Sequence, residues 1–102
     1  MTRDLMPRVL RQGKVCTSAV GTLRFLSLPQ GPSLFSVVVS KRVAKSAVVR
    51  NKLKRWGREV AHTNFQHAGS SYAAVFTFRP QKAPLRFTEF KESLSFMLRQ
   101  MR

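Results

Sequence analysis

The spacing of hydrophobic residues changes along the chain and divides its N-terminal part into three expected elements. Apolar side chains at positions 5, 6, 9 and 10 predict a short helix over residues 5–12. Residues 20–28 and 34–40 are rich in β-forming residues and flank the sequence PQGP, whose two prolines and glycine favour a turn. We therefore expect two strands that pair with each other across this turn.

Start and stop signals bound the first and last expected helices. Asp4 stands where an N-cap is expected, and Gly13 supplies a C-terminal stop. Near the other end of the chain, Thr88 is the expected cap of a last helix. Its apolar residues follow the 3, 4 spacing of one buried stripe. They are Phe90, Leu94, Met97, Leu98 and Met101.

A third strand is expected over residues 72–78, YAAVFTF, which are apolar on both alternating faces apart from Thr77. This pattern predicts a central strand covered on both sides, and Pro80 ends it. The expected order is helix, strand, strand, helix, strand, helix. It is typical of an α+β fold, a two-layer α/β sandwich in which helices pack on a small mixed sheet. With 102 residues, the chain is expected to form a single domain over 1–102.

Residues 46–60, SAVVRNKLKRWGREV, predict an amphipathic helix. At 100° per residue its large hydrophobes share an arc of about 60°, which we expect to face the sheet. These residues are Val49, Leu53, Trp56 and Val60. Gly57 weakens the helix, yet it permits close approach of a neighbouring backbone, either that of RNA or that of the sheet.

Positive charge dominates the composition. The chain has 19 Lys and Arg against four acids, for a formal charge of +15. Self-repulsion of this size indicates a polyanionic partner: nucleic acid, an anionic membrane surface or an acidic protein. Residues 41–58 contain eight cations and no acid, in a mixture of Arg, Lys and Asn that suits phosphate and sugar contacts. The candidate RNA-binding residues are Lys41, Arg42, Lys45, Arg50, Asn51, Lys52, Lys54, Arg55 and Arg58.

Residues that could form a catalytic or metal-binding site in the protein, namely acids, cysteine and histidine, are few. The acids are scattered at positions 4, 59, 89 and 92, so no pair suits a metal-dependent nuclease. Cys16 is the only cysteine, and His62 and His67 have no ligand set around them, so we expect no metal bound by the protein. No stretch has the length of an apolar membrane span, and no signal-type apolar core follows the basic N-terminus. We expect a cytoplasmic protein, with a short organelle-targeting presequence as the alternative.

Residues 40–60, SKRVAKSAVVRNKLKRWGREV, resemble the signature of the bacterial ribonuclease P protein subunit. That family carries Ser-Lys-Lys or a variant at a strand end, then Arg-Asn-Arg, an apolar residue, Lys-Arg and a further Arg. The matching residues here are Ser40, Lys41, Arg42, Arg50, Asn51, Lys54, Arg55 and Arg58, and FRP at 78–80 resembles the strand end before the family's last helix. Lys52 departs from the pattern, since it stands where the second Arg is usual, and Trp56 and Gly57 depart as well.

The resemblance implies a fold like the second domain of ribosomal protein S5, with a left-handed crossover through the basic helix. It also implies a catalytic RNA subunit that holds Mg²⁺ at its active site, with no catalytic residue in the protein. The partners would be ribonuclease P RNA, at one protein per RNA, and precursor tRNA, whose 5′ leader is removed. A cleft between the first helix and the sheet would hold the leader, and its expected residues here are Met6, Leu10, Phe35 and Val37. The family has aromatic residues at the positions of Met6 and Leu10.

Three other interpretations share the charge of this chain. A ribosomal-protein-like module would bind folded RNA without a role in cleavage. A DNA-binding protein would use residues 47–62 as a recognition helix, but the strands expected on either side argue against a helix-turn-helix. A membrane-active cationic protein would need an exposed apolar face, and the apolar arc here is expected to face the core.

Overall fold

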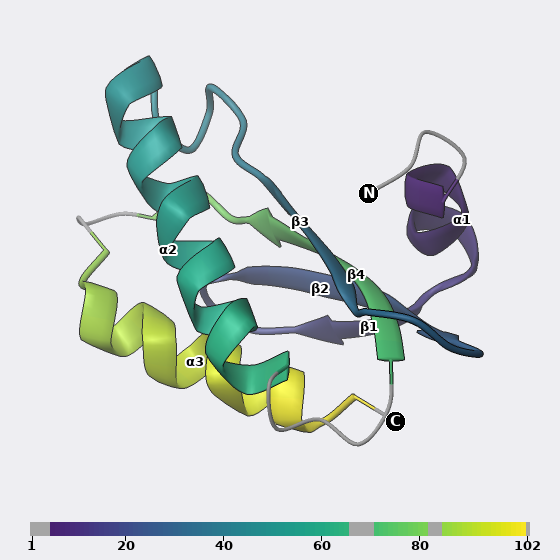
Figure 1. The fold of residues 1–102 in the computed structure, drawn as a ribbon. Helices are drawn as coiled ribbons and strands as arrows, with labels where there is room; N and C mark the ends of the chain where they lie inside the picture. The colour runs from purple at the N-terminus through teal and green to yellow at the C-terminus, as the bar shows by residue number, and fades with distance from the viewer. Residues whose placement is uncertain (1–4, 66–70, 82–84, 102) are drawn as a thin grey trace.

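The computed structural model describes residues 5–65, 71–81 and 85–101. Its elements follow in the order helix, three strands, helix, strand, helix (Figure 1). They are α1 (Leu5–Gln12), β1 (Lys14–Thr17), β2 (Gly21–Leu28), β3 (Leu34–Val38), α2 (Ala47–Phe65), β4 (Ser71–Phe78) and α3 (Phe87–Arg99). The mixed α+β class is confirmed, and β1 is a strand that the hydrophobic pattern did not reveal. The predicted cap Asp4 lies outside the described residues.

The four strands form one sheet in the order β1-β2-β4-β3. Strand β4 is antiparallel to β2 and parallel to β3, so its predicted central place is confirmed. The predicted pairing of the second and third strands with each other is wrong, because β4 lies between them. The connection from β2 to β3 crosses the start of β4 and is tied to it there: Ser71 Oγ donates to the Gly31 carbonyl, and the Tyr72 amide donates to Ser33 Oγ at 3.0 Å.

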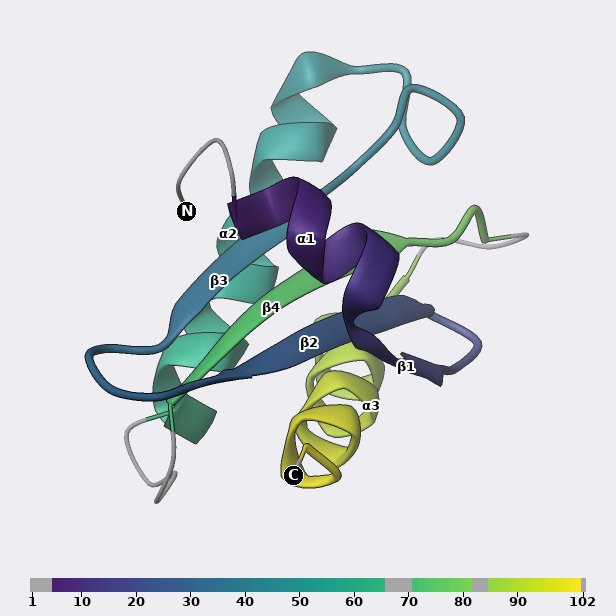
Figure 2. The ribbon, with the colours of Figure 1, turned by 90° about the vertical axis from the view of Figure 1, so that its right-hand side faces the viewer.

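Helices cover both faces of the sheet, as the two views in Figures 1 and 2 show. The larger core cluster joins α2 and α3 to one face, where Phe76, Phe90 and Leu94 are fully buried. Helix α1 lies on the opposite face, where Val9 packs against Ala73 and Val75. The helices α2 and α3 therefore form one complete layer on the sheet, and α1 adds a partial third layer.

The connection from β3 through α2 to β4 joins two neighbouring parallel strands. Seen from the α1 side in Figure 2, β4 lies to the right of β3 when both point upward, and α2 passes behind the sheet. The crossover is therefore left-handed, against the usual preference. This agrees with the fold that the family resemblance implied.

The apolar stripe of the last helix is confirmed for Phe90, Leu94, Met97 and Leu98, while Met101 is buried beyond the end of the helix. The predicted cap is wrong. Helix α3 already includes Thr88; its N-cap is Arg86, in extended backbone and without a side-chain capping bond. Phe87 is held in the helix by tertiary packing, since its ring meets that of Trp56 edge to face at 5.2 Å. Tertiary packing therefore places the start of α3 before Thr88, the residue that the local capping signal had indicated.

Candidate nucleic-acid interface

The predicted RNA-binding residues lie on one continuous segment, formed by the turn after β3 and by α2 as far as Arg58. We call this set the basic surface: Lys41, Arg42, Lys45, Arg50, Asn51, Lys52, Lys54, Arg55 and Arg58. Seven of the nine are exposed, and only Arg50 and Lys54 are half-buried. The first turns of α2 project past the sheet in Figures 1 and 2, so this end of the helix is open on several sides. For that reason Val49, predicted to face the sheet, is 43% exposed.

The turn between β3 and α2 is held by its own backbone and by one arginine. The amides of Val43 and Ala44 donate to the Ser40 carbonyl at 3.1 and 3.3 Å. Arg50 Nη1 donates to the carbonyls of Ala44 and Lys45 at 3.0 and 2.8 Å. Arg50 therefore fastens the loop to the first turn of the helix, a positioning role that the sequence pattern did not indicate.

Helix α2 is seated on the sheet by a set of residues that differs in part from the predicted one, with Gly57 and Ala61 buried as well. Leu53 and Val60 are buried as expected, and Trp56 is half-buried. Gly57 is buried against β3: a Cβ at this position would lie 2.8 Å from Val37 Cγ2. The neighbour that requires a glycine here is therefore the sheet.

The two flanks of α2 hold their cations differently. On the flank toward α3, Lys52 Nζ lies 4.9 Å from the centroid of the Trp56 ring, close enough for a cation–π contact. Trp56 itself packs against Phe87 and Phe90 of α3. On the flank toward β3, Arg58 lies at the edge of a cavity. Cations therefore lie on two flanks of α2, and each flank could contact phosphate groups.

The structure does not bring the four residues of the predicted leader cleft together. Met6 packs with the α1 cluster, and Leu10 is 42% exposed on the same helix. Phe35 and Val37 belong to the opposite face, in register with Ala74 and Phe76. Because side chains alternate along a strand, the residues of β3 that share a face with α1 lie one position away. These residues are Leu34, Ser36 and Val38.

The prediction did not include a cation of the sheet that lies on the α1 face. Arg24 lies in β2 opposite Val75, between the inward-facing Leu23 and Phe25. It is half-buried beside the cluster that α1 covers. The alternation of β2 could have placed it, since a lone Arg between two core positions must face away from that core.

Other kinds of site have little support in the described part of the chain. Among these residues, no three His, Cys, Asp or Glu side chains are grouped so that they could hold a metal ion. Cys16 is half-buried against the core, His62 is exposed, and His67 lies outside the described residues. None of the helices described has the length and apolar character needed to span a membrane.

Comparisons with known proteins agree in sequence and in fold. The sequence model of the family described as Ribonuclease P matches residues 2–102. The ribonuclease P protein component of Microcystis aeruginosa is 34% identical over 68 residues, which are 67% of this chain and 57% of that protein. The component of Synechococcus sp. is 30% identical over 96 residues, 89% of this chain and 72% of the relative. The first alignment thus spans little more than half the length of that relative.

Solved structures show the same architecture. The RNase P protein from Thermotoga maritima, in complex with 1-(4-fluorophenyl)-2-thiourea, has a TM-score of 0.84 and 25% identity. The superposition covers 98% of this chain and 95% of the Thermotoga maritima chain. The RNase P protein of Staphylococcus aureus, at 19% identity, has a TM-score of 0.83 over 97% of this chain and 90% of its own. The last comparison supports the fold alone.

Proposed function

The chain belongs to the ribonuclease P protein family, and from this premise we propose that it is the protein subunit of a ribonuclease P ribonucleoprotein. It binds the catalytic RNA and the 5′ leader of precursor tRNA, and it promotes endonucleolytic removal of that leader. The observation that carries this proposal is the basic surface itself. The eight cations of the family-like segment 40–60 are gathered on one projecting helix and its loop, and six of them are exposed.

In this proposal the protein provides charge and orientation, and the RNA provides the chemistry. The RNA subunit would hold the magnesium ions, which would supply an activated water and charge stabilisation for the leaving oxygen. Two polyanions, the RNA subunit and precursor tRNA, must approach each other closely. A domain of charge +15 between them lowers their repulsion, so less Mg²⁺ is needed for binding.

The basic surface is divided between the two RNAs in the same proposal. Arg50, Asn51, Lys54 and Arg58 lie near the leader or the active-site region. The remaining cations, Lys41, Arg42, Lys45, Lys52 and Arg55, hold the RNA subunit. The leader cleft uses the α1 face, with Met6 and Leu10 on the helix. Because these two side chains are not aromatic, the leader is gripped with little base stacking.

We also propose that one protein binds each RNA subunit and that the enzyme acts in the cytoplasm.

The first test adds the purified chain to a bacterial ribonuclease P RNA at low Mg²⁺ and follows release of a labelled precursor tRNA leader. Cleavage should be faster than with RNA alone, and raising Mg²⁺ should reduce the difference. Binding of the RNA without any stimulation of cleavage would instead favour a plain RNA-binding module.

A further inference from the structure

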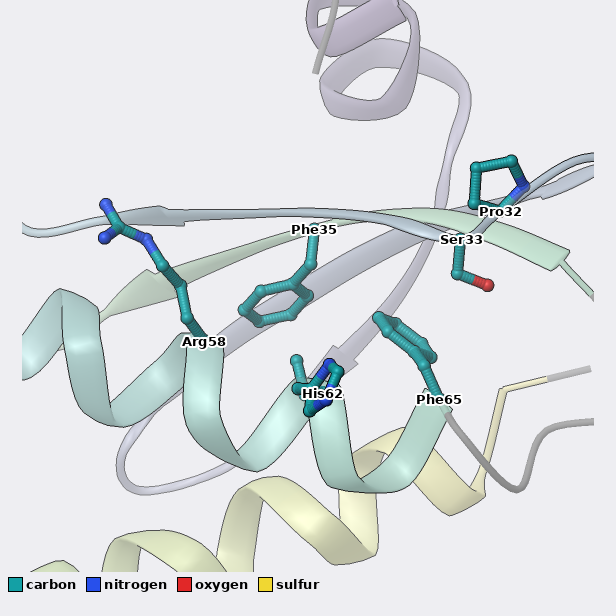
Figure 3. Close-up of a pocket in the computed structure, with 7 residues that line it drawn as sticks. Pro32, Ser33, Phe35, Arg58, His62 and Phe65 are labelled. Atoms are coloured by element: carbon teal, nitrogen blue, oxygen red, sulfur yellow. The ribbon is translucent and has the colours of Figure 1, made fainter.

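A cavity of about 520 Å³ lies between the C-terminal half of α2 and the start of β3 (Figure 3). Its walls include Phe35 from β3 and Phe65 from the end of α2, whose rings meet edge to face at 6.0 Å. Both rings are half-buried, and Ala61 is buried beside them. The cavity is on the face of the sheet opposite α1, so it is separate from the proposed leader cleft.

The polar groups at this cavity indicate which kind of ligand it would bind. Arg58 and His62 line it from α2, and both are exposed. None of the described residues that line it is acidic. Ser33 is already engaged, because its Oγ accepts the Tyr72 amide. The cavity therefore offers aromatic surface together with a guanidinium, a combination that suits a planar ring carrying a negative group.

The cavity lies at the end of a row of cations. Arg50, Lys54 and Arg58 follow one another at four-residue spacing, so they lie along one flank of α2. An RNA backbone that follows this row reaches Arg58 at the edge of the cavity. The volume is within the range of about 300–1,000 Å³ that is usual for small-molecule sites, and it is large enough for one nucleotide.

We propose that this cavity holds one unpaired nucleotide of the RNA subunit, with its base against Phe35 and Phe65 and its phosphate on Arg58. The proposal rests on the proposed function. The RNA subunit is the source, because the cavity is on the face of the sheet opposite the leader cleft, and the active-site region near which Arg58 is placed belongs to that RNA. A base held in this way would fix the register of the RNA along the helix.

The test compares Phe65→Leu with the matched control Phe96→Leu, which changes an exposed phenylalanine of α3 outside the cavity. Affinity for ribonuclease P RNA is measured without precursor tRNA, over a range of salt concentrations. We expect Phe65→Leu to weaken binding about five-fold or more, since stacking on an aromatic ring contributes about 1–3 kcal/mol per base. The slope of log K against log salt should not change, because stacking releases no counterion. Phe96→Leu should leave both quantities unchanged.

A second measurement uses the unaltered chain and so does not depend on how the variant folds. Ribonuclease P RNA containing 4-thiouridine is crosslinked to the protein by light, and the linked peptides are identified. A crosslink at Phe35 or Phe65 supports the site, and crosslinks confined to other peptides overturn it.

The outcomes separate the cavity from the function. If the unaltered chain stimulates cleavage but Phe65→Leu and Phe96→Leu bind the RNA equally well, the cavity proposal is wrong and the proposed function stands. If Phe65→Leu affects binding of precursor tRNA alone, the RNA subunit is not the occupant and the proposal also fails. If the unaltered chain neither binds nor stimulates the RNA, both proposals fall together.

Discussion

At Gly57 the basic helix comes so close to β3 that no side chain fits between them. A Cβ there would lie 2.8 Å from Val37 Cγ2 and 3.3 Å from Cγ1. Valine is stiff at χ1, so it has little freedom to move aside. The glycine costs about 1 kcal/mol in helix propensity, and the close approach of α2 to the sheet offsets this cost.

We therefore predict that Gly57→Ala destabilises the fold, by about 1 kcal/mol net, because overpacking of about 1–3 kcal/mol exceeds the gain in helix propensity. Urea unfolding at fixed salt measures the change. In a Val37→Ala background the clash is removed, and the same Gly57→Ala substitution should become stabilising. Equal effects of Gly57→Ala in the two backgrounds would show that Val37 does not set the spacing.

At the scale of elements, sequence reasoning found the helices better than the sheet topology. The 3, 4 stripe of α3 and the apolar arc of α2 are local signals, so the sequence predicts most of their buried residues, although Val49 is exposed where α2 projects past the sheet. The pairing of strands is not local. Residues 20–28 and 34–40 flank a turn that suits a hairpin, and nothing within either strand favours a different neighbour. Only the two-sided burial of β4 indicates that it must lie between two strands.

The candidate site shows the same division. Lys41, Arg55 and the other cations could be predicted as candidate RNA contacts, because a motif and a charge run are properties of the chain alone. The hydrogen bonds by which Arg50 fastens the loop could not be predicted, because they depend on where the carbonyls of Ala44 and Lys45 point after folding. Phe35 was placed in the wrong group because the sequence does not show which face of β3 meets α1.

The basic helix carries a prediction of its own, concerning salt. Each phosphate contact releases about one counterion, so Lys52→Ala and Arg55→Ala should each reduce the slope of log K against log salt by about 1 for ribonuclease P RNA. Lys91→Ala, on the exposed face of α3, is the matched control and should leave the slope unchanged. If the slopes of all three variants equal that of the unaltered chain, α2 does not contact the phosphates.

For the whole molecule, the large positive charge lowers the stability of the folded protein when no RNA is bound. The formal charge of +15 is carried by only 102 residues, with a Cα radius of gyration of 13.0 Å. Many of these charges lie closer together than the Debye length of about 10 Å at 0.1 M salt, so they repel one another in the free protein. Bound RNA would remove this repulsion, and so would dissolved ions.

The free protein should therefore become more stable as salt is added, while its affinity for RNA falls. Urea unfolding in about 0.05 M and about 0.5 M NaCl should show a higher midpoint at the higher salt, with an unchanged m-value, because screening acts on the compact state. Sodium sulfate at equal ionic strength separates two causes. An equal rise in midpoint indicates general screening alone, and a larger rise with sulfate indicates a further stabilisation, by sulfate excluded from the protein surface or held at particular cations. A midpoint that does not rise in either salt would mean that the fold already accommodates its charge, and that relief of repulsion contributes little to RNA binding.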